Sequence, residues 1–318
     1  MPENQIPSSI FNALPAESAY NLSDVVKTRP QFSAITPRWL TQMLEFKGLK
    51  AGVYRVNRVT DTAVPLDVLS LKNHEKIEIP KGYIGYETAP REYRLSALST
   101  ILNVDTRIND VYSSPYDQAE EQLSLAVEVL KERQEHLLLN GDDYGILKNA
   151  PPARRISPLA DAPTPDDLDE LLALVWKEPS FFLAHPRAIA AFLRECTLRG
   201  VPPQTTTIGG GVFVLWRGIP IVPSDKIAIR NATKSGSGKT DILLIRTGEE
   251  KRGVIGLYQT DLHAEAAPGL SVRFRGVDDD GIGSYLISLY CAAAVLSDDA
   301  VGVLQNVEIG LYRGKERK

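Results

Sequence analysis

The segment 115–139 constrains the fold most, because its apolar residues recur at helical spacing over 25 residues. A helix of that length measures about 37 Å. Ser114 is placed to cap it, a proline occupies its first position, and Asn140-Gly141 ends it. Charged residues such as Glu128 and Glu132 are expected outside the apolar stripe, which consists of Tyr116, Ala119, Leu123, Val127, Leu130, Leu137 and Leu138. The chain therefore has to build a domain along one long helix.

Shorter elements are predicted before this helix. Thr36-Pro37 predicts a short helix that ends at Gly48, with the threonine as its N-cap. The stretch 53–59 alternates with period two, yet both of its faces carry apolar and basic or polar side chains. Such a strand fits a two-stranded ribbon that meets other chains or solvent better than the centre of a sheet. The first 35 residues combine several prolines with scattered large apolar side chains, which is typical of an arm lying on a neighbouring subunit.

The second half of the chain mixes helices with strands. Helices are predicted after Thr164-Pro165 and after Pro186, with a short buried strand at 180–184 between them. The segment 282–296 is either helical or extended. Further strands are expected at 212–216, 219–222, 241–246, 254–258, 271–274 and 301–309. The pattern as a whole predicts an α+β fold without internal repeats.

Composition excludes several classes of protein. With 43% hydrophobic and 24% charged residues among 318, the chain reads as globular rather than disordered or collagen-like. Its net charge of −4 argues against a protein whose main task is to grip nucleic acid. Cys196 and Cys291 lie in apolar stretches, which predicts buried free thiols in a reducing cytosol. The N-terminus does not resemble a secretory signal and the apolar run 285–296 is too short for a membrane span, so a cytoplasmic protein is expected.

Three motif-like stretches fail the tests of the chemistry they suggest. The segment 233–240 resembles a phosphate-binding loop, but Thr233 stands where that loop needs glycine, and a strand rather than a helix is predicted to follow. Asp278–Gly281 lacks the first ligand and the closing glutamate of a calcium loop, which favours an acidic surface turn. The histidines are scattered, and His185-Pro186 is predicted to be a turn at a strand-to-helix junction. The sequence therefore predicts no catalytic residue, no cofactor and no metal.

Three segments carry a resemblance to a known family. They are 36–40 (TPRWL), 51–58 (AGVYRVNR) and 216–226 (WRGIPIVPSDK). In this order they resemble the second family of encapsulins, bacterial shell proteins with the major capsid fold of tailed phages, the Hong Kong 97 type. The resemblance covers nearly the whole chain. Because the chain has no room for a cyclic-nucleotide-binding insertion, it resembles the short subtype, 2A, which lacks that domain.

The resemblance implies a division of the chain into capsid-type parts. These are an N-terminal arm (1–35), an extended loop that clasps neighbouring subunits (51–105), a peripheral domain (36–50 and 106–160, with the spine helix 115–139), an axial domain (161–295), and a return strand of the peripheral domain with a C-terminal tail (296–318). Two sets of residues are candidates for the assembly. The intersubunit ribbon is expected to use Tyr54, Arg55, Asn57 and Arg58. A five-fold pore is expected near 200–211, lined by Pro202, Pro203, Thr205, Thr206 and Thr207.

The function follows from the resemblance as well. It implies a chain that assembles with itself, as a 60-mer, into an icosahedral nanocompartment in the cytoplasm. The cargo implied for the short subtype is a cysteine desulfurase, and the role is sulfur metabolism or storage. Neither nucleic acid nor a membrane is expected as a partner. Two alternatives stay open: a phage-type major capsid protein that packages DNA, and an α/β enzyme with a cryptic site.

Overall fold

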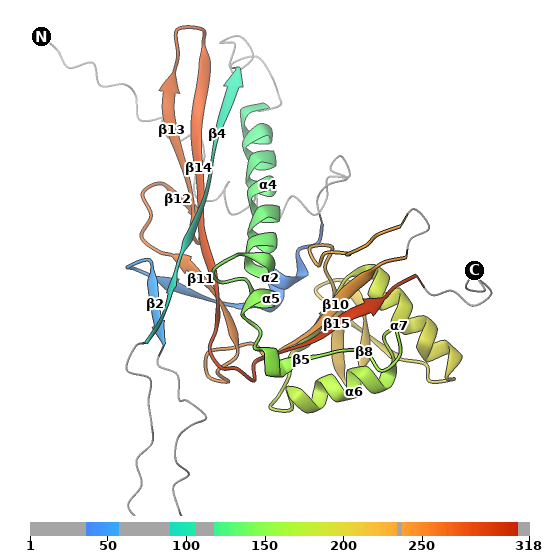
Figure 1. Cartoon of the computed structure of the whole chain (residues 1–318). Coiled ribbons are helices and arrows are strands. Elements are labelled where there is room, and N and C mark those ends of the chain that lie inside the picture. The colour runs from blue at the N-terminus through green and yellow to red at the C-terminus, as the bar shows by residue number, and fades with distance from the viewer. Residues whose placement is uncertain (1–35, 57–89, 106–117, 234–236, 311–318) are drawn as a thin grey trace, which may run out of the picture.

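The computed structural model describes residues 36–56, 90–105, 118–233 and 237–310. Its strands form two large sheets and one two-stranded ribbon. A tall wing, built from the long helix α4 (Gln118–Asn140) and the strands beside it, rises from a broader part that contains α6 (Pro165–Leu174) and α7 (Pro186–Leu198) (Figure 1). The α+β class predicted from the sequence is confirmed.

A six-stranded sheet forms the wing. Its spatial order is β1 (Glu45–Leu49), β11 (Val254–Gln259), β14 (Ile282–Val295), β13 (Leu270–Val277) and β12 (Glu265–Ala267), and β4 (Ser96–Asp105) also pairs with β14. The segment 282–296 was predicted to be either helical or extended. It forms the strand β14, which is 14 residues long. Leu123, Val127 and Leu130 of α4 pack on one face of this sheet, in a cluster with Tyr285, Ile287 and Leu289. The helix is thus the spine of the wing.

The broader part is built on a seven-stranded sheet. Its spatial order is β5 (Arg155–Ile156), β15 (Val301–Glu308), β10 (Lys239–Ile245), β6 (Phe181–Ala184), β9 (Ile219–Pro223), β8 (Gly211–Trp216) and β7 (Gln204–Ile208). One face packs against α6 and α7. The other face meets α2 (Trp39–Met43), the end of α4 and α5 (Ile146–Asn149), which a 3-10 helix, η2 (Pro152–Arg154), follows. The ribbon consists of β2 (Val53–Val56) and β3 (Arg91–Arg94).

Local signals place several helix ends correctly. The α6 helix begins with a capping box in which Thr164 and Asp167 exchange hydrogen bonds. At the start of α7, the side chain of His185 accepts a hydrogen bond from the amide of Arg187, so this histidine is the predicted turn residue. The α4 helix ends at Asn140, as expected. Its predicted cap, Ser114, lies outside the described residues.

The helix predicted from Thr36 to Gly48 is wrong in its extent. Only Trp39–Met43 is helical, and Gly48 lies in β1. The strand forms because β1 pairs in parallel with β11, which places Phe46 over Gly256. A Cβ at Gly256 would lie 2.4 Å from the ring of Phe46, so the close approach requires glycine. Pairing with a strand 210 residues further along the chain outweighs the local helical pattern.

Strand pairing also divides the chain differently from the expected boundary at residue 295. Strands β11 to β14, expected in the part 161–295, belong to the wing with β1, β4 and α4. Strand β15, expected to return to the part that holds the spine helix, pairs instead with β10 and β5 in the seven-stranded sheet. Nothing in the local sequence of these strands specifies the sheet that each one joins.

Candidate assembly surfaces

The predicted two-stranded ribbon exists, and its two faces differ. Arg55 is exposed and pairs across the ribbon with Glu92, at 2.8 Å. Tyr54 points to the opposite side, where its hydroxyl donates to Glu249 at 2.7 Å. Burial and this acceptor raise the pKa of Tyr54 to about 12. The contacts of Tyr54 thus lie within its own chain, whereas Arg55, the other described candidate of the ribbon, is exposed.

The remaining ribbon candidates, Asn57 and Arg58, lie outside the described residues. The same is true of the arm 1–35 and of the central part of the predicted extended loop, 57–89. The last strand assigned to that loop, β4, pairs with β14 in the wing. Within the described part of the segment 51–105, the ribbon β2–β3 lies beside the wing (Figure 1), and its Tyr93 packs in one hydrophobic cluster with Ile255 and Leu257 of β11.

The segment expected to be a pore loop is in part a β-hairpin. Strand β7 pairs antiparallel with β8 and forms one edge of the seven-stranded sheet. The turn between them, Gly209-Gly210, has positive φ at both residues, which suits a tight hairpin. Trp39 packs against this turn and meets Phe213 edge-on, with ring centroids 4.9 Å apart. The turn is therefore tied to α2 and the core.

This hairpin corrects the expectation of one threonine-lined rim. Side chains alternate along a strand, so Thr206 shares a face with its partner Phe213, whereas Thr205 and Thr207 lie on the other face. Thr205 and Thr207 are exposed and Thr206 is half-buried. Pro202, exposed, and Pro203, half-buried, lie in the connection from α7. The pore itself stays a prediction.

A cluster of three glutamates on α4 is the site that sequence reasoning missed. Glu128 and Glu132 were expected in solvent, yet Glu128 is 2% exposed and binds the guanidinium of Arg38. Glu132 accepts from Thr36 and pairs with Lys226, whose Nζ lies 2.5 Å from Oε2. Glu135, 1% exposed, accepts from the amide of Leu40. The three carboxylates therefore hold the segment 36–40 on the spine helix.

The buried carboxylates of this cluster differ in their electrostatic surroundings. Burial raises the pKa of Glu135 to about 7, against the lowering effect of the Leu40 amide and Lys226. The second oxygen of Glu128, Oε1, is buried 3.9 Å from the ammonium of Lys131. The spacing 128, 132, 135 keeps all three groups on one helix face. That spacing was visible in the sequence, but its partners lie about 95 positions away.

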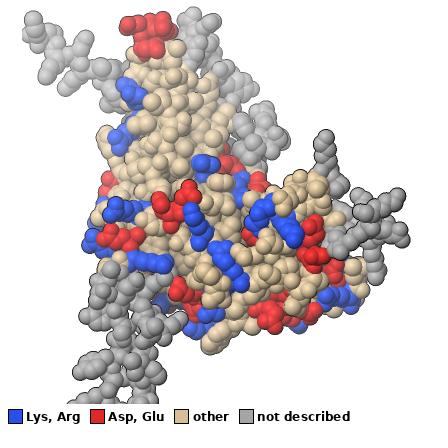
Figure 2. Space-filling view, in the orientation of Figure 1, with Lys and Arg blue, Asp and Glu red and all other residues tan. Residues whose placement is uncertain are grey.

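The motif-like stretches behave as the sequence predicted. The segment 233–240, which resembles a phosphate-binding loop, leads into the strand β10 at Lys239 and not into a helix. In the turn between β13 and β14, the carboxylate of Asp278 accepts hydrogen bonds from the amides of Asp280 and Ile282, at 3.1 and 2.8 Å. This segment is an acidic surface turn. Figure 2 shows acidic side chains at the tip of the wing.

The two cysteines and two of the histidines lie in separate places of the fold. Cys196 and Cys291 are buried free thiols, as predicted, and burial raises the pKa of each. Burial also lowers the pKa of His136 and His185, and positive neighbours lower it further. Within the described ranges no group of His, Cys, Asp and Glu is placed to hold a metal ion. No described helix is both long enough and apolar enough to cross a membrane.

Solved structures of low sequence identity share this fold. The capsid of the native GTA particle matches with a TM-score of 0.59 at 12% identity, over 88% of this chain and 95% of that one. The virus-like particle from Pyrococcus furiosus matches with a TM-score of 0.52 at 13% identity, over 91% of this chain and 96% of that one. These likenesses show the phage capsid fold of the Hong Kong 97 type.

Closer relatives decide the family. A family model described as type 2A encapsulin shell protein SrpI-like matches residues 54–311. The type 2A encapsulin shell protein SrpI of Synechococcus elongatus is 50% identical, over 94% of this chain and 95% of that protein. The type 2A encapsulin shell protein of Mycolicibacterium paratuberculosis is 49% identical, over 93% of this chain and 94% of that one. The chain belongs to the type 2A encapsulin shell family.

The encapsulin fold agrees over nearly the entire length. The holo-SrpI encapsulin complex of Synechococcus elongatus matches with a TM-score of 0.79 at 48% identity, over 96% of this chain and all of that one. The family resemblance predicted from three short segments is confirmed. Because the relatives are shell proteins, the chain is a structural component of an encapsulin nanocompartment, and the alternative of an α/β enzyme is wrong.

Proposed function

We propose that sixty copies of this encapsulin close into an icosahedral shell around a cysteine desulfurase. The observation that supports it is the half-identical sequence shared with SrpI over 94% of the chain. The related structure is described as a holo encapsulin complex, which fits a shell that works together with contents. The alternative of a DNA-packaging capsid rests only on the fold shared with proteins of 11 to 13% identity.

Assembly is tested by sedimentation of the purified full chain. Sixty copies of 35.0 kDa give a particle of about 2.1 MDa, and closed symmetry satisfies every subunit edge. We expect one sharp boundary at this mass and hollow particles by electron microscopy. Monomers or dimers alone contradict the shell. An absorbance ratio dominated by nucleic acid at 260 nm would favour the DNA-packaging alternative instead.

The cargo needs a separate experiment. A shell with no catalytic residues of its own acts through what it encloses. A weak docking contact is sufficient, because dozens of identical inner sites raise the local concentration of a captured enzyme. The role follows: sulfur released from cysteine is confined in the shell, and small polar molecules cross its pores.

Co-expression with a cysteine desulfurase from the same organism tests this cargo. We expect yellow particles that absorb at about 420 nm, because the enclosed enzyme carries pyridoxal phosphate. Shells made alone serve as the control and stay colourless. A desulfurase that separates from the shells on a size column contradicts the cargo while the shell assignment stands.

A further inference from the structure

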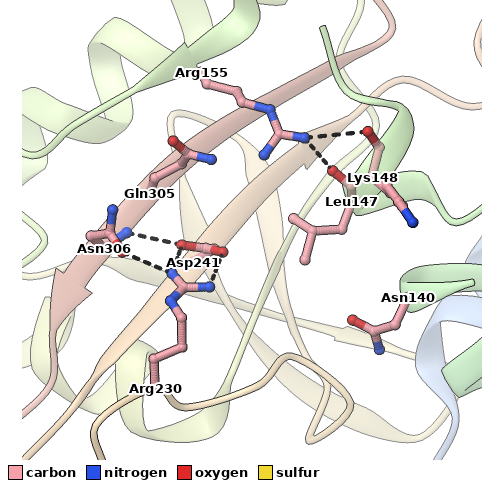
Figure 3. A pocket seen from close by; sticks show the side chains of 8 residues that line it. All are labelled: Asn140, Leu147, Lys148, Arg155, Arg230, Asp241, Gln305 and Asn306. Carbon is pink, nitrogen blue, oxygen red and sulfur yellow. Dashed lines mark hydrogen bonds and ion pairs between the residues drawn. The ribbon is translucent and has the colours of Figure 1, made fainter. Parts of the chain in front are cut away.

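A cavity of about 330 Å³ opens beside the seven-stranded sheet, where α4 ends and α5 begins. Figure 3 shows the side chains that surround it. They come from the end of α4, from α5, from the loop before β10 and from three strands: Asn140, Leu147, Lys148, Arg155, Arg230, Asp241, Gln305 and Asn306. The cavity is separate from the ribbon, the hairpin and the glutamate cluster described above.

A β-bulge shapes the floor of this cavity. The register between β10 and β15 shifts between Thr240 and Ile242, so Asp241 alone opposes both Gln305 and Asn306. Asn306 takes a left-handed φ of 60°, a conformation that asparagine tolerates better than most residues. Its main-chain N–H donates to the carboxylate of Asp241 at 2.9 Å. Bulges of this kind often occur where a sheet aims side chains at a ligand.

The charges around the cavity do not cancel. Arg230 binds both oxygens of Asp241, at 2.9 and 2.5 Å, so that carboxylate is fully used (Figure 3). Within the part of the chain that the structure describes, Arg155 donates only to the main-chain carbonyls of Leu147, Lys148 and Ala150, which carry no charge. No carboxylate among the described residues pairs with Arg155. The cavity therefore keeps a guanidinium whose charge is not neutralised.

Two further side chains with N–H donors, Gln305 and Lys148, line the same cavity. The side-chain amide of Gln305 makes no hydrogen bond within the described part of the chain. Lys148 pairs with Asp142 at 2.9 Å, but both side chains are more than half exposed, and such surface pairs are weak. A planar guanidinium is well suited to bind a carboxylate, and an amide N–H that lines the same cavity can donate to the same group.

We propose that this cavity binds a carboxylate ligand of the size of a small dicarboxylate. Arg155 and Gln305 donate to one carboxylate, and Lys148 supplies the positive charge at the mouth. The same group is found on a free dicarboxylic acid and on an acidic side chain of a bound peptide. The proposal is independent of the identity of the cargo.

Calorimetric titration of assembled shells with succinate tests the site, and a neutral-capped peptide with one glutamate forms a second arm. We expect saturable binding, one ligand per chain, that weakens as salt is raised. Saturation by succinate assigns a free acid, and saturation by the peptide alone assigns a peptide side chain. Absence of saturable binding by both probes overturns the proposal.

Matched variants separate the cavity from general charge effects. Gln305→Glu keeps the shape of the side chain and places a negative charge in the same cavity as Arg155, so affinity should fall at least about tenfold, the effect of one charge-assisted hydrogen bond. Lys148→Gln should weaken binding about threefold, because its charge is exposed. Lys251→Gln removes a comparably exposed cation elsewhere and should change nothing. Electron microscopy confirms that each variant still forms shells. Unchanged affinity in Gln305→Glu overturns the site.

Discussion

Glu132 of the spine helix binds Thr36 twice, accepting from its hydroxyl at 2.8 Å and from its main-chain amide at 3.0 Å. Lys226, from the loop after β9, completes the contact with its ammonium 2.5 Å from the same carboxylate. Thr36 is the first residue that the structure describes. The carboxylate of Glu132 therefore connects α4 to the residues just before α2 and to the loop after β9.

Glu132→Ala should destabilise the fold by about 2 kcal/mol, because it leaves the two Thr36 donors without their acceptor and removes one of the two carboxylates, Glu132 and Asp225, that pair with the ammonium of Lys226. Chemical denaturation of the purified protein measures the change. Glu132→Gln keeps an acceptor for Thr36 and should lose less. Lys251→Ala, at an exposed ion pair, is the control with no measurable effect. Equal stability of Glu132→Ala and this control would show that the contact contributes nothing.

The stability of the same region should depend on pH through Glu135. Its pKa is raised to about 7 from an ordinary value near 4.5, so the fold prefers the protonated form. The stabilisation is complete below pH 4.5 and is lost as the pH rises to 7, because only the folded chain keeps this proton. At about 1.4 kcal/mol per pKa unit, the loss approaches about 3 kcal/mol.

Glu135→Gln tests that dependence. The amide still accepts from Leu40 and carries no charge, so the variant should match the wild type at pH 4.5 and melt higher at pH 8. Thermal unfolding at the two pH values measures the difference. A wild type that is the more stable protein at pH 8 contradicts the raised pKa.

Arg55→Ala should impair shell assembly without unfolding the subunit. Arg55 is exposed and, among the described residues, is bonded only to Glu92 on the neighbouring strand, so its loss leaves the core intact. Circular dichroism checks the fold, and light scattering checks the assembly. Lys251→Ala is again the matched control. If Arg55→Ala forms shells as readily as the control, the outward face of the ribbon is not an intersubunit contact.

Neither the wild type nor the Lys239→Ala variant should bind nucleotide. The lysine begins β10, and the helix N-terminus that holds phosphates in a true phosphate loop does not follow it. Titration with ATP is the measurement. Micromolar binding that vanishes in the variant contradicts this interpretation.

The hairpin β7–β8 predicts where a five-fold pore is lined. Thr205 and Thr207 share one exposed face, so those two hydroxyls, and not that of Thr206, should face the opening. A map of the assembled shell tests the position. Threonines lying more than roughly 20 Å from the five-fold axis are too distant to line a pore, and the assignment then fails.

Local sequence determined much of this molecule. The period of the apolar residues predicted the long helix, the capping signals at Thr164 and His185 placed two helix starts, and the glycine-poor apolar runs predicted most strands. The three quoted segments sufficed to indicate the family. All of these features depend on residues that are neighbours along the chain.

Only the tertiary structure decided where those elements go. The run 45–49 became a strand because β11 was there to pair with it, and β15 joined the seven-stranded sheet through β10 and β5. Glu128 and Glu135 are buried because the segment 36–40, some 90 residues earlier, lies over them and supplies a guanidinium and an amide. The period of the apolar residues along the sequence indicates which side chains are buried. A carboxylate, however, is buried only where a partner, here one distant in sequence, compensates for its desolvation. That partner is chosen by the fold, and no local pattern contains it.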